Sequence, residues 1–268
     1  MPTSRIAFQE LPPAVIAAVE KRTGPILKVE PANEGFNSEV AARVFTETES
    51  CFIKGMRADH RRIWTQRREA EVNQFLTGLT PELLWHTEEA GWNLLGFELL
   101  EGHHADYSPG SPDLPKVADL LRRLGEIPCP EIELRQAEQR LEGYAASAKD
   151  LDFFAGNALL HTDLNNANVL VDDSARLVDW AWATRGAPWL DAGYWVIWLM
   201  AAGGHTPDSA EQWASHVPAW SAAPSAGVTA FAVANAAMWQ EIGGEDPDPW
   251  TARLVTAARN WATYRKSL

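Results

Sequence analysis

The stretch HTDLNNANVLVDDSARLVDW, residues 161–180, sets a cluster of polar side chains directly before a short apolar run. That run, at 169–171, has the pattern of a β-strand, and residues 176–178 can return as a second strand. Four residues, DDSA, separate the two runs and can form a turn. The stretch therefore predicts a short β-hairpin preceded by a loop rich in aspartate and asparagine.

The expected hairpin register brings two oxygen-bearing side chains together. If Val171 pairs with Arg176, Asn168 lies opposite Asp179 at the open end of the hairpin. An amide oxygen and a carboxylate are hard ligands that suit Mg²⁺, which takes its other ligands from water and phosphates. Asp163 precedes Asn168 in the chain, and its loop is long enough to cross the same open end.

The pattern H-x-D-x-x-x-x-N, followed by a metal-binding aspartate, is typical of phosphoryl transfer. This chemistry needs a carboxylate that orients and deprotonates the attacking hydroxyl, a role that we assign to Asp163. It also needs metal ligands, for which Asn168 and Asp179 are the candidates. His161 is expected to bond the loop backbone rather than to transfer a proton. Each residue alone would fit an ordinary asparagine-rich turn, whereas all four at this spacing favour catalysis.

A phosphotransferase also needs a lysine for the phosphates and a carboxylate that holds this lysine. CFIKGM places Lys54 on a predicted strand, where alternation points it to the face opposite Ile53. Its partner is Glu69 or Glu71, both within RREAEV, and we favour Glu69 because it shares a helix flank with Val72. An isolated strand lysine would more simply face solvent.

The loop NEGFNSE, residues 33–39, lies between the first two predicted strands. It has a single glycine and does not match G-x-G-x-x-G. Its backbone amides with Asn37 or Ser38 can cradle phosphate, although a plain hairpin loop explains each side chain equally well.

Six stretches of the chain resemble the aminoglycoside phosphotransferase and choline-kinase-like family, small-molecule relatives of the protein kinases. They are CFIK, REAEV, FELLEG, HTDLNNANVLV, LVDW and PWLDAGYW, and they span most of residues 30–200. The resemblance implies that the chain uses a nucleoside triphosphate, ATP or GTP, together with Mg²⁺. It implies that FELLEG is a hinge whose Glu98 and Leu100 backbone groups meet the purine. It also implies that Asp191 braces the catalytic loop, although this residue would equally suit a helix N-cap.

The fold class that follows is α+β, a bilobal protein-kinase-like fold with a small β-rich N-terminal lobe and a larger helical C-terminal lobe. We expect a nucleotide-binding lobe at 1–97, a hinge at 98–102, and a catalytic and acceptor-binding lobe at 103–268. The first lobe has helical patterns at 13–23 and 61–79, and strand patterns at 26–30, 40–46 and 51–56. The second has helical patterns from 117 to 124 and at 132–148, 191–202, 226–242 and 249–265.

Two departures from the protein kinases and their relatives bear on the acceptor. Residues 180–190 are too few for an activation loop and a protein-docking segment, which favours a small-molecule acceptor. The C-terminus, NWATYRKSL, is basic, whereas several aminoglycoside kinases resemble one another in ending with acidic residues. The basic end argues against an aminoglycoside.

Composition limits the partners. The net charge of −13 argues against a nucleic-acid partner, since phosphate backbones require a basic surface. No apolar stretch is long enough for a membrane helix, and no export signal is visible. With two cysteines expected to be reduced, we expect a cytoplasmic protein without an obligate protein partner.

The acceptor side is less defined. Trp182 follows Asp179 closely and can line the cleft, either stacking on a ring or holding a cation. An acidic run that includes Glu245 can meet amines, or can be a solvated loop. The expected function is phosphoryl transfer to a hydroxyl of a small molecule, with an antibiotic (an aminoglycoside, a nucleoside or another hydroxylated natural product) ranked first, as in a resistance-type kinase. The alternatives are a metabolic kinase acting on choline, a sugar or an amino alcohol, and a non-catalytic kinase-fold nucleotide-binding module.

Overall fold

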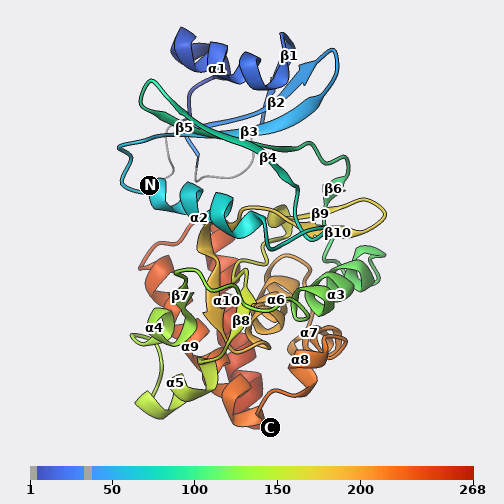
Figure 1. Cartoon of the computed structure of the whole chain (residues 1–268). Helices are drawn as coiled ribbons and strands as arrows, with labels where there is room; N and C mark the ends of the chain where they lie inside the picture. The colour runs from blue at the N-terminus through green and yellow to red at the C-terminus, as the bar shows by residue number, and fades with distance from the viewer. Residues whose placement is uncertain (1–4, 33–37) are drawn as a thin grey trace. The chain divides into compact units, whose positions relative to one another are not determined.

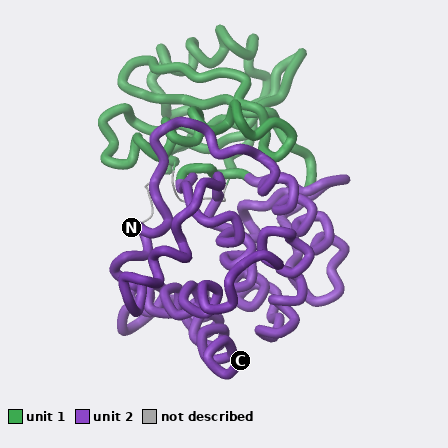
Figure 2. Tube along the Cα trace, turned by 60° about the horizontal axis from the view of Figure 1, so that its bottom comes forward, with its two compact units in different colours: residues 1–102, 178–181 green, residues 103–177, 182–268 purple. Residues whose placement is uncertain are grey.

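The computed structural model describes residues 5–32 and 38–268. The chain forms two compact units, which Figure 2 colours separately. Unit 1 comprises Met1–Gly102 and Val178–Ala181, and unit 2 comprises His103–Leu177 and Trp182–Leu268. Among the described residues, no helix combines the length and the apolar character that a membrane span requires.

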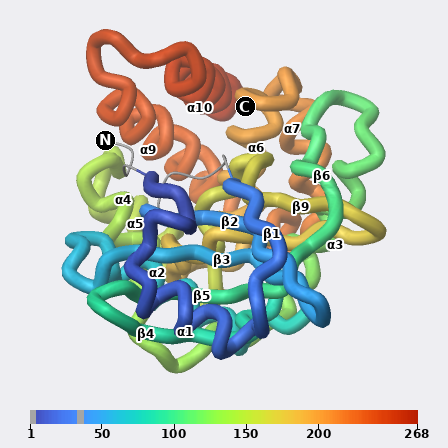
Figure 3. Tube along the Cα trace, turned by 90° about the horizontal axis from the view of Figure 1, so that it is seen from above, coloured from blue at the N-terminus to red at the C-terminus, as the bar shows by residue number. Residues whose placement is uncertain are grey.

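Unit 1 is built on a five-stranded antiparallel sheet with the strand order β1-β2-β3-β5-β4 (Figures 1 and 3). Its strands are β1 (Ile26–Pro31), β2 (Val40–Thr46), β3 (Ser50–Arg57), β4 (Leu83–Glu89) and β5 (Trp92–Glu98). Its helices are the 3-10 turn η1 (Phe8–Glu10), α1 (Pro13–Thr23) and α2 (Ile63–Asn73).

Helix α1 begins and ends where the sequence signals it. Pro13 occupies the first turn, where a missing N–H costs nothing, and Gly24 follows the helix with φ 83°, a conformation that favours glycine. The predicted helix 61–79 is shorter in the structure, because the chain leaves helical geometry after Asn73 and forms turns up to Leu79.

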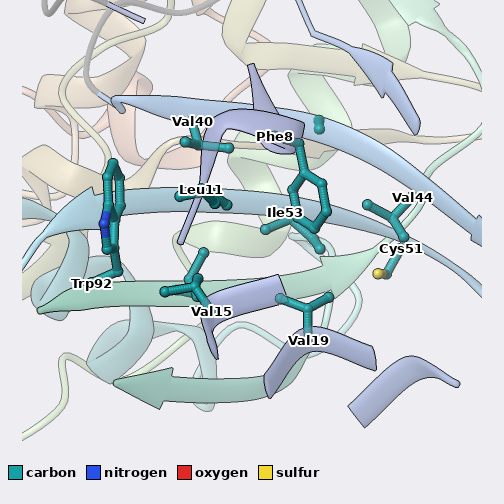
Figure 4. Packing of buried hydrophobic residues seen from close by; sticks show 11 residues of the cluster. Phe8, Leu11, Val15, Val19, Val40, Val44, Cys51, Ile53 and Trp92 are labelled. Atoms are coloured by element: carbon teal, nitrogen blue, oxygen red, sulfur yellow. The ribbon is translucent and has the colours of Figure 1, made fainter. Parts of the chain in front are cut away.

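One face of the sheet carries the core of unit 1. Val15 and Val19 of α1 pack against residues that alternate along the strands, including Val44 and Ile53 (Figure 4). Since side chains alternate across a strand, Lys54 points to the opposite face from Ile53. This opposite face is the one that contributes to the candidate site.

Unit 2 is mostly helical and holds two small sheets. One sheet has the order β10-β9-β6 and the other β7-β11-β8. The strands are β6 (His103–His104), β7 (Arg135–Gln136), β8 (Ala158–Leu160), β9 (Val169–Val171), β10 (Ala175–Leu177) and β11 (Thr184–Gly186). The helices are α3 (Asp113–Leu124), α4 (Ala137–Leu141), α5 (Ala148–Phe154), α6 (Leu190–Ala201), α7 (Pro207–Ala214), α8 (Pro218–Ser221), α9 (Ser225–Gly243) and α10 (Pro249–Ser267). The 3-10 turn η2 (Asn166–Asn168) also belongs to unit 2, whereas η3 (Trp180–Trp182) starts in the unit 1 segment and ends with Trp182 of unit 2.

The core of unit 2 surrounds α6, in which every residue except Met200 is buried. Phe231 of α9 packs edge-on against Trp189 and Tyr194, with ring centroids 5.5 and 4.9 Å apart. Trp195 is fully buried, so this tryptophan belongs to the core and not to a ligand surface. The predicted α+β class is confirmed.

The helix expected at 132–148 does not form as one element. The chain instead makes the short strand β7, the short helix α4 and then α5. Arg135 and Gln136 pair in parallel with Thr184 and Arg185 of β11, and this ladder holds the segment extended. Strand pairing with a distant segment is a tertiary effect that the local pattern could not reveal.

The hairpin forms as predicted, but its register is shifted by one residue. Val171 pairs with Ala175 rather than with Arg176, and Val169 pairs with Leu177. The turn is shorter because the Asp172 side chain accepts a hydrogen bond from the Ser174 backbone N–H at 2.9 Å. The expected register that set Asn168 opposite Asp179 is therefore wrong.

We predict that Gly96→Ala destabilises unit 1. Gly96 pairs with Trp85 across β4 and β5, and a Cβ at this position would lie 2.1 Å from the Trp85 indole. Overpacking of this kind costs about 1–3 kcal/mol in the free energy of unfolding, which chemical denaturation measures. Gly143→Ala is the matched control because nothing lies within 4 Å of its Cβ. Equal denaturation midpoints for the two variants would contradict the prediction.

Candidate active site

Lys54 forms a short ion pair with Glu69 inside unit 1. Its Nζ lies 2.7 Å from Oε1 and 3.0 Å from Oε2 of Glu69. The two side chains are only 15% and 8% exposed. Glu71, the alternative partner, instead lies 3.6 Å from Arg68 and is 46% exposed. The helix α2 therefore presents Glu69, and not Glu71, to the lysine.

Asp179 joins this pair from the segment 178–181. Its Oδ1 lies 3.6 Å from Lys54 Nζ, and its backbone has φ 66°. Burial alone lowers the pKa of Lys54, but the carboxylates of Asp179 and Glu69 outweigh it and raise this pKa. Lys54 is therefore a fixed ammonium that two carboxylates share, and one of these belongs to the predicted metal ligands.

The predicted catalytic loop lies in unit 2, and Asp191 holds its beginning. The buried carboxylate of Asp191 accepts the backbone N–H of His161 and of Thr162, each at 2.8 Å. Thr162 has φ 67°, a conformation that a β-branched residue rarely adopts. Asp191 stands within the first turn of α6 and is not its N-cap, a position that Trp189 occupies. Two charge-assisted hydrogen bonds thus fix an otherwise unfavourable turn before Asp163.

Burial also changes the ionisation of this group. It raises the pKa of Asp191 from 3.8 to about 6, while the two backbone N–H groups and Arg140 oppose the rise. The sequence pattern gave no sign of this effect, because it depends on the complete packing of α6 against the loop.

Asp163 and its neighbours form a network of bonds along the loop. Asp163 is half-buried, and its N–H donates to Nδ1 of the fully buried His161 at 3.3 Å. Its Oδ1 accepts the N–H of Asn165 at 3.3 Å. Tyr107 donates its hydroxyl to the carbonyl of Leu164 at 3.0 Å. The carboxylate is thereby oriented by the loop while it remains partly open to solvent.

Asn168 ends the 3-10 turn η2, whose start is capped by the side chain of Asn165. Its Nδ2 donates to the carbonyl of Asp163 at 3.3 Å. Within the described residues its Oδ1 has no protein partner and is free to bind a cation.

The two side chains expected to bind Mg²⁺ belong to different units, Asp179 to unit 1 and Asn168 to unit 2. Among the described residues, no group of three or more His, Cys, Asp and Glu side chains gathers to hold a metal. An all-protein cage is therefore missing from this part of the chain. Mg²⁺ commonly uses one or two protein oxygens and completes its shell with water and substrate phosphates. The carboxylate of Asp179 and the amide oxygen of Asn168 are of this kind.

Four further residues, Glu98, Leu100, Asn37 and Ser38, are the candidates for contact with the purine and the phosphates of the nucleotide. Glu98 ends β5, and its backbone N–H donates to the carbonyl of Glu82 at 2.8 Å. Leu100 lies half-buried in the chain after β5. Ser38 is buried two residues before the start of β2, whereas Asn37 lies outside the described residues.

The two acceptor candidates lie in different surroundings within unit 2. Glu245 is exposed in the loop between α9 and α10. Trp182 is half-buried, and the guanidinium groups of Arg135 and Arg140 lie near its ring. Sequence reasoning missed both arginines, since they lie more than forty residues before Trp182 in the chain and form no motif with it.

Comparisons with known proteins identify the fold. No protein-family model matches the sequence, and no curated protein matches it. Solved structures do match. Choline kinase LicA from Streptococcus pneumoniae has 15% sequence identity and a TM-score of 0.65, over 93% of this chain and 98% of that chain.

The aminoglycoside phosphotransferase APH(4)-Ia has 13% identity and a TM-score of 0.58, over 92% of this chain and 98% of that chain. A thermostable mutant of this enzyme, in a ternary complex with ADP and hygromycin B, gives 14% identity and a TM-score of 0.57, over 92% and 99% of the two chains. The fold that the sequence resemblance implied is confirmed. The chain has the kinase-like fold that choline kinase LicA and APH(4)-Ia share.

Proposed function

We propose that the protein transfers the γ-phosphoryl group of a nucleoside triphosphate, ATP or GTP, to a hydroxyl of a small molecule. The observation that carries the proposal is the loop at Asp163, where bonds of the backbone N–H groups to Asp191 and His161 fix the chain and the N–H of Asn165 holds the carboxylate of the half-buried Asp163. A structural aspartate would not need a strained and braced loop of this kind. The kinase-like fold supports the same reaction class.

Each residue then has a defined task. Asp163 accepts a hydrogen bond from the acceptor hydroxyl, orients its oxygen toward the phosphorus and takes its proton as the new bond forms. Lys54 binds phosphate oxygens and is held in place by Glu69. Asn168 and Asp179 would hold Mg²⁺, which neutralises the charge that develops on the phosphates. Glu98 and Leu100 would contact the purine, and Asn37 and Ser38 the phosphates.

Two other functions, a non-catalytic nucleotide-binding module and a protein kinase, fit the chain less well. A non-catalytic nucleotide-binding module has no use for a base, whereas Asp163, Lys54 and Asp179 are all present. A protein kinase needs a long segment between its metal aspartate and the following helix. Here residues 180–190 are taken up by η3, β11 and the start of α6, which leaves no activation loop.

The sequence and the ligands of similar structures bear on the class of acceptor. We rank a hydroxylated natural product such as an antibiotic first, because APH(4)-Ia was crystallised with hygromycin B. A metabolic small-molecule acceptor is the second candidate, favoured by the higher TM-score of choline kinase LicA, 0.65 against 0.57. Release of ADP or GDP in the presence of aminoglycosides, nucleoside antibiotics, macrolides, choline and sugars tests the proposal. A failure of the protein to bind any nucleoside triphosphate would refute it.

Asp163→Asn should lower turnover by at least about 10²-fold, because it removes the base but keeps the shape of the side chain. Nucleotide affinity and the denaturation midpoint should stay near those of the unchanged protein. Steady-state kinetics and calorimetric titration of the nucleotide measure these quantities. A variant with near-normal turnover would exclude Asp163 as the catalytic carboxylate.

Asp179→Ala should abolish phosphoryl transfer at every Mg²⁺ concentration, since the remaining amide ligand of Asn168 is neutral and weak. The measurement is a Mg²⁺ titration of activity at saturating nucleotide. Full recovery of activity at high Mg²⁺ would show that Asp179 is not a metal ligand.

Glu69→Gln should lower kcat/KM for the nucleotide by about 10- to 100-fold, the loss expected for a charge-assisted hydrogen bond of about 1.5–3 kcal/mol. Glu71→Gln is the matched control, because it makes the same change on the same helix without touching Lys54. The two variants are compared by initial rates over a range of nucleotide concentrations. Equal effects of the two changes would contradict the role of Glu69.

A further inference from the structure

Two guanidinium groups, those of Arg135 and Arg140, lie near the ring of Trp182. The Cζ atom of Arg135 lies 4.9 Å from the centre of the ring, and that of Arg140 lies 5.6 Å from it. Arg135 belongs to β7, and Arg140 to the helix α4 that follows. The π face that could hold a cationic substrate is thus already engaged by guanidinium groups of the protein.

Arg140 is fixed beside the catalytic loop. Its Nη1 donates to the hydroxyls of Thr162 and Thr184, each at 2.6 Å, and to the carbonyl of Trp182 at 3.4 Å. Thr162 directly precedes Asp163 in the chain. The guanidinium therefore has a defined position next to the residue that we assign as the base.

The rest of this guanidinium is unused by the protein. All hydrogen bonds of Arg140 to the described residues involve Nη1, so Nη2 and Nε have no protein acceptor there. No carboxylate of these residues lies within 4 Å of it in an ion pair. Arg140 also interacts electrostatically with Asp191, but both oxygens of Asp191 already accept loop N–H groups. Two adjacent guanidinium nitrogens thus remain to bind an anion.

We propose that the acceptor carries an anionic group, a carboxylate or a phosphate, which binds at the cluster of Arg135, Trp182 and Arg140. The inference rests on the proposed phosphotransferase function and names the chemistry of its acceptor. A planar guanidinium binds a carboxylate or a phosphate through two parallel hydrogen bonds, and here the guanidinium is held in place before the ligand arrives. An ammonium group such as that of choline would meet like charge at this position.

The acidic balance of the chain does not oppose this inference. Residues 98–268 contain 12 basic and 23 acidic side chains, but salt screens exposed charges beyond about 8 Å. Some of the acidic groups also have local structural tasks. Asp248 caps α10 by accepting the N–H of Trp250 and of Thr251, and Glu241 accepts the hydroxyl of Tyr144. At Trp182 the nearby guanidinium groups of Arg135 and Arg140 supply positive charge, and Arg140 also bonds Thr162, the residue before Asp163.

A panel of acceptors with matched hydroxyl frameworks tests the inference. Glucose, glucosamine, glucuronate and glucose 6-phosphate differ in charge on one ring, as do glycerol, serinol, glycerate and glycerol phosphate on a shorter chain. Acceptor-dependent release of ADP should be at least about tenfold more efficient in kcat/KM for the anionic members. Affinity for each member is also measured by calorimetry with a non-hydrolysable ATP analogue present, so the ranking does not depend on turnover.

Arg135→Gln should raise the KM and Kd of the anionic members about tenfold and leave the nucleotide KM unchanged. Arg122→Gln is the matched control, since this arginine pairs on the surface of α3 with Asp119 and Glu126. Equal or weaker binding of the anionic members, or an unchanged Kd in Arg135→Gln, would overturn the inference. Absence of binding of the ATP analogue would instead refute the phosphotransferase function itself.

Discussion

The two hydrogen bonds that the buried carboxylate of Asp191 accepts from the loop at 161–162 fix the candidate catalytic residue. They hold Thr162 at φ 67° and so determine the direction in which the chain presents Asp163. Ionising a buried carboxylate is costly, and the pKa of Asp191 rises to about 6. Since the folded pKa exceeds the ordinary value, this group lowers the free energy of unfolding as pH rises from about 4 to about 6. The Asp191 carboxylate therefore lowers the free energy of unfolding above about pH 6, while it holds the loop at 161–162 in one conformation.

Unit 1 also contains a charged group with little exposure, the ammonium of Lys54, which lies between two carboxylates. Lys54 is nearly buried, which would lower its pKa, but Glu69 and Asp179 keep it charged. Removal of one carboxylate leaves a buried charge with less compensation, which is why Glu69 and Glu71 should differ so strongly in their effects. In unit 2 the hydroxyls of Thr162 and Thr184 hold the guanidinium of Arg140, and none of the described carboxylates forms an ion pair with it. The proposed anionic acceptor would bind to this charge.

Much of the fold followed from local patterns. The proline and glycine signals around α1 predicted its bounds, and the periodicity of α9 and α10 predicted both long helices within a few residues. The patterns failed where a distant strand intervened, as at β7, and where a side chain shortened a turn, as Asp172 does. In both places the competing interaction is absent from the local periodicity.

The sequence by itself determined the identities and the spacing of His161, Asp163 and Asn168, because a short loop keeps its residues close whatever the rest of the chain does. It also determined that Lys54 lies on a strand, with its side chain on the opposite face of the sheet from that of Ile53. Only the tertiary structure decided that Glu69 pairs with this lysine, since the choice depends on how α2 is rotated against the sheet. Only the tertiary structure brought Arg135 and Arg140 to Trp182, because contacts between segments so far apart arise from packing and leave no periodic trace in the sequence.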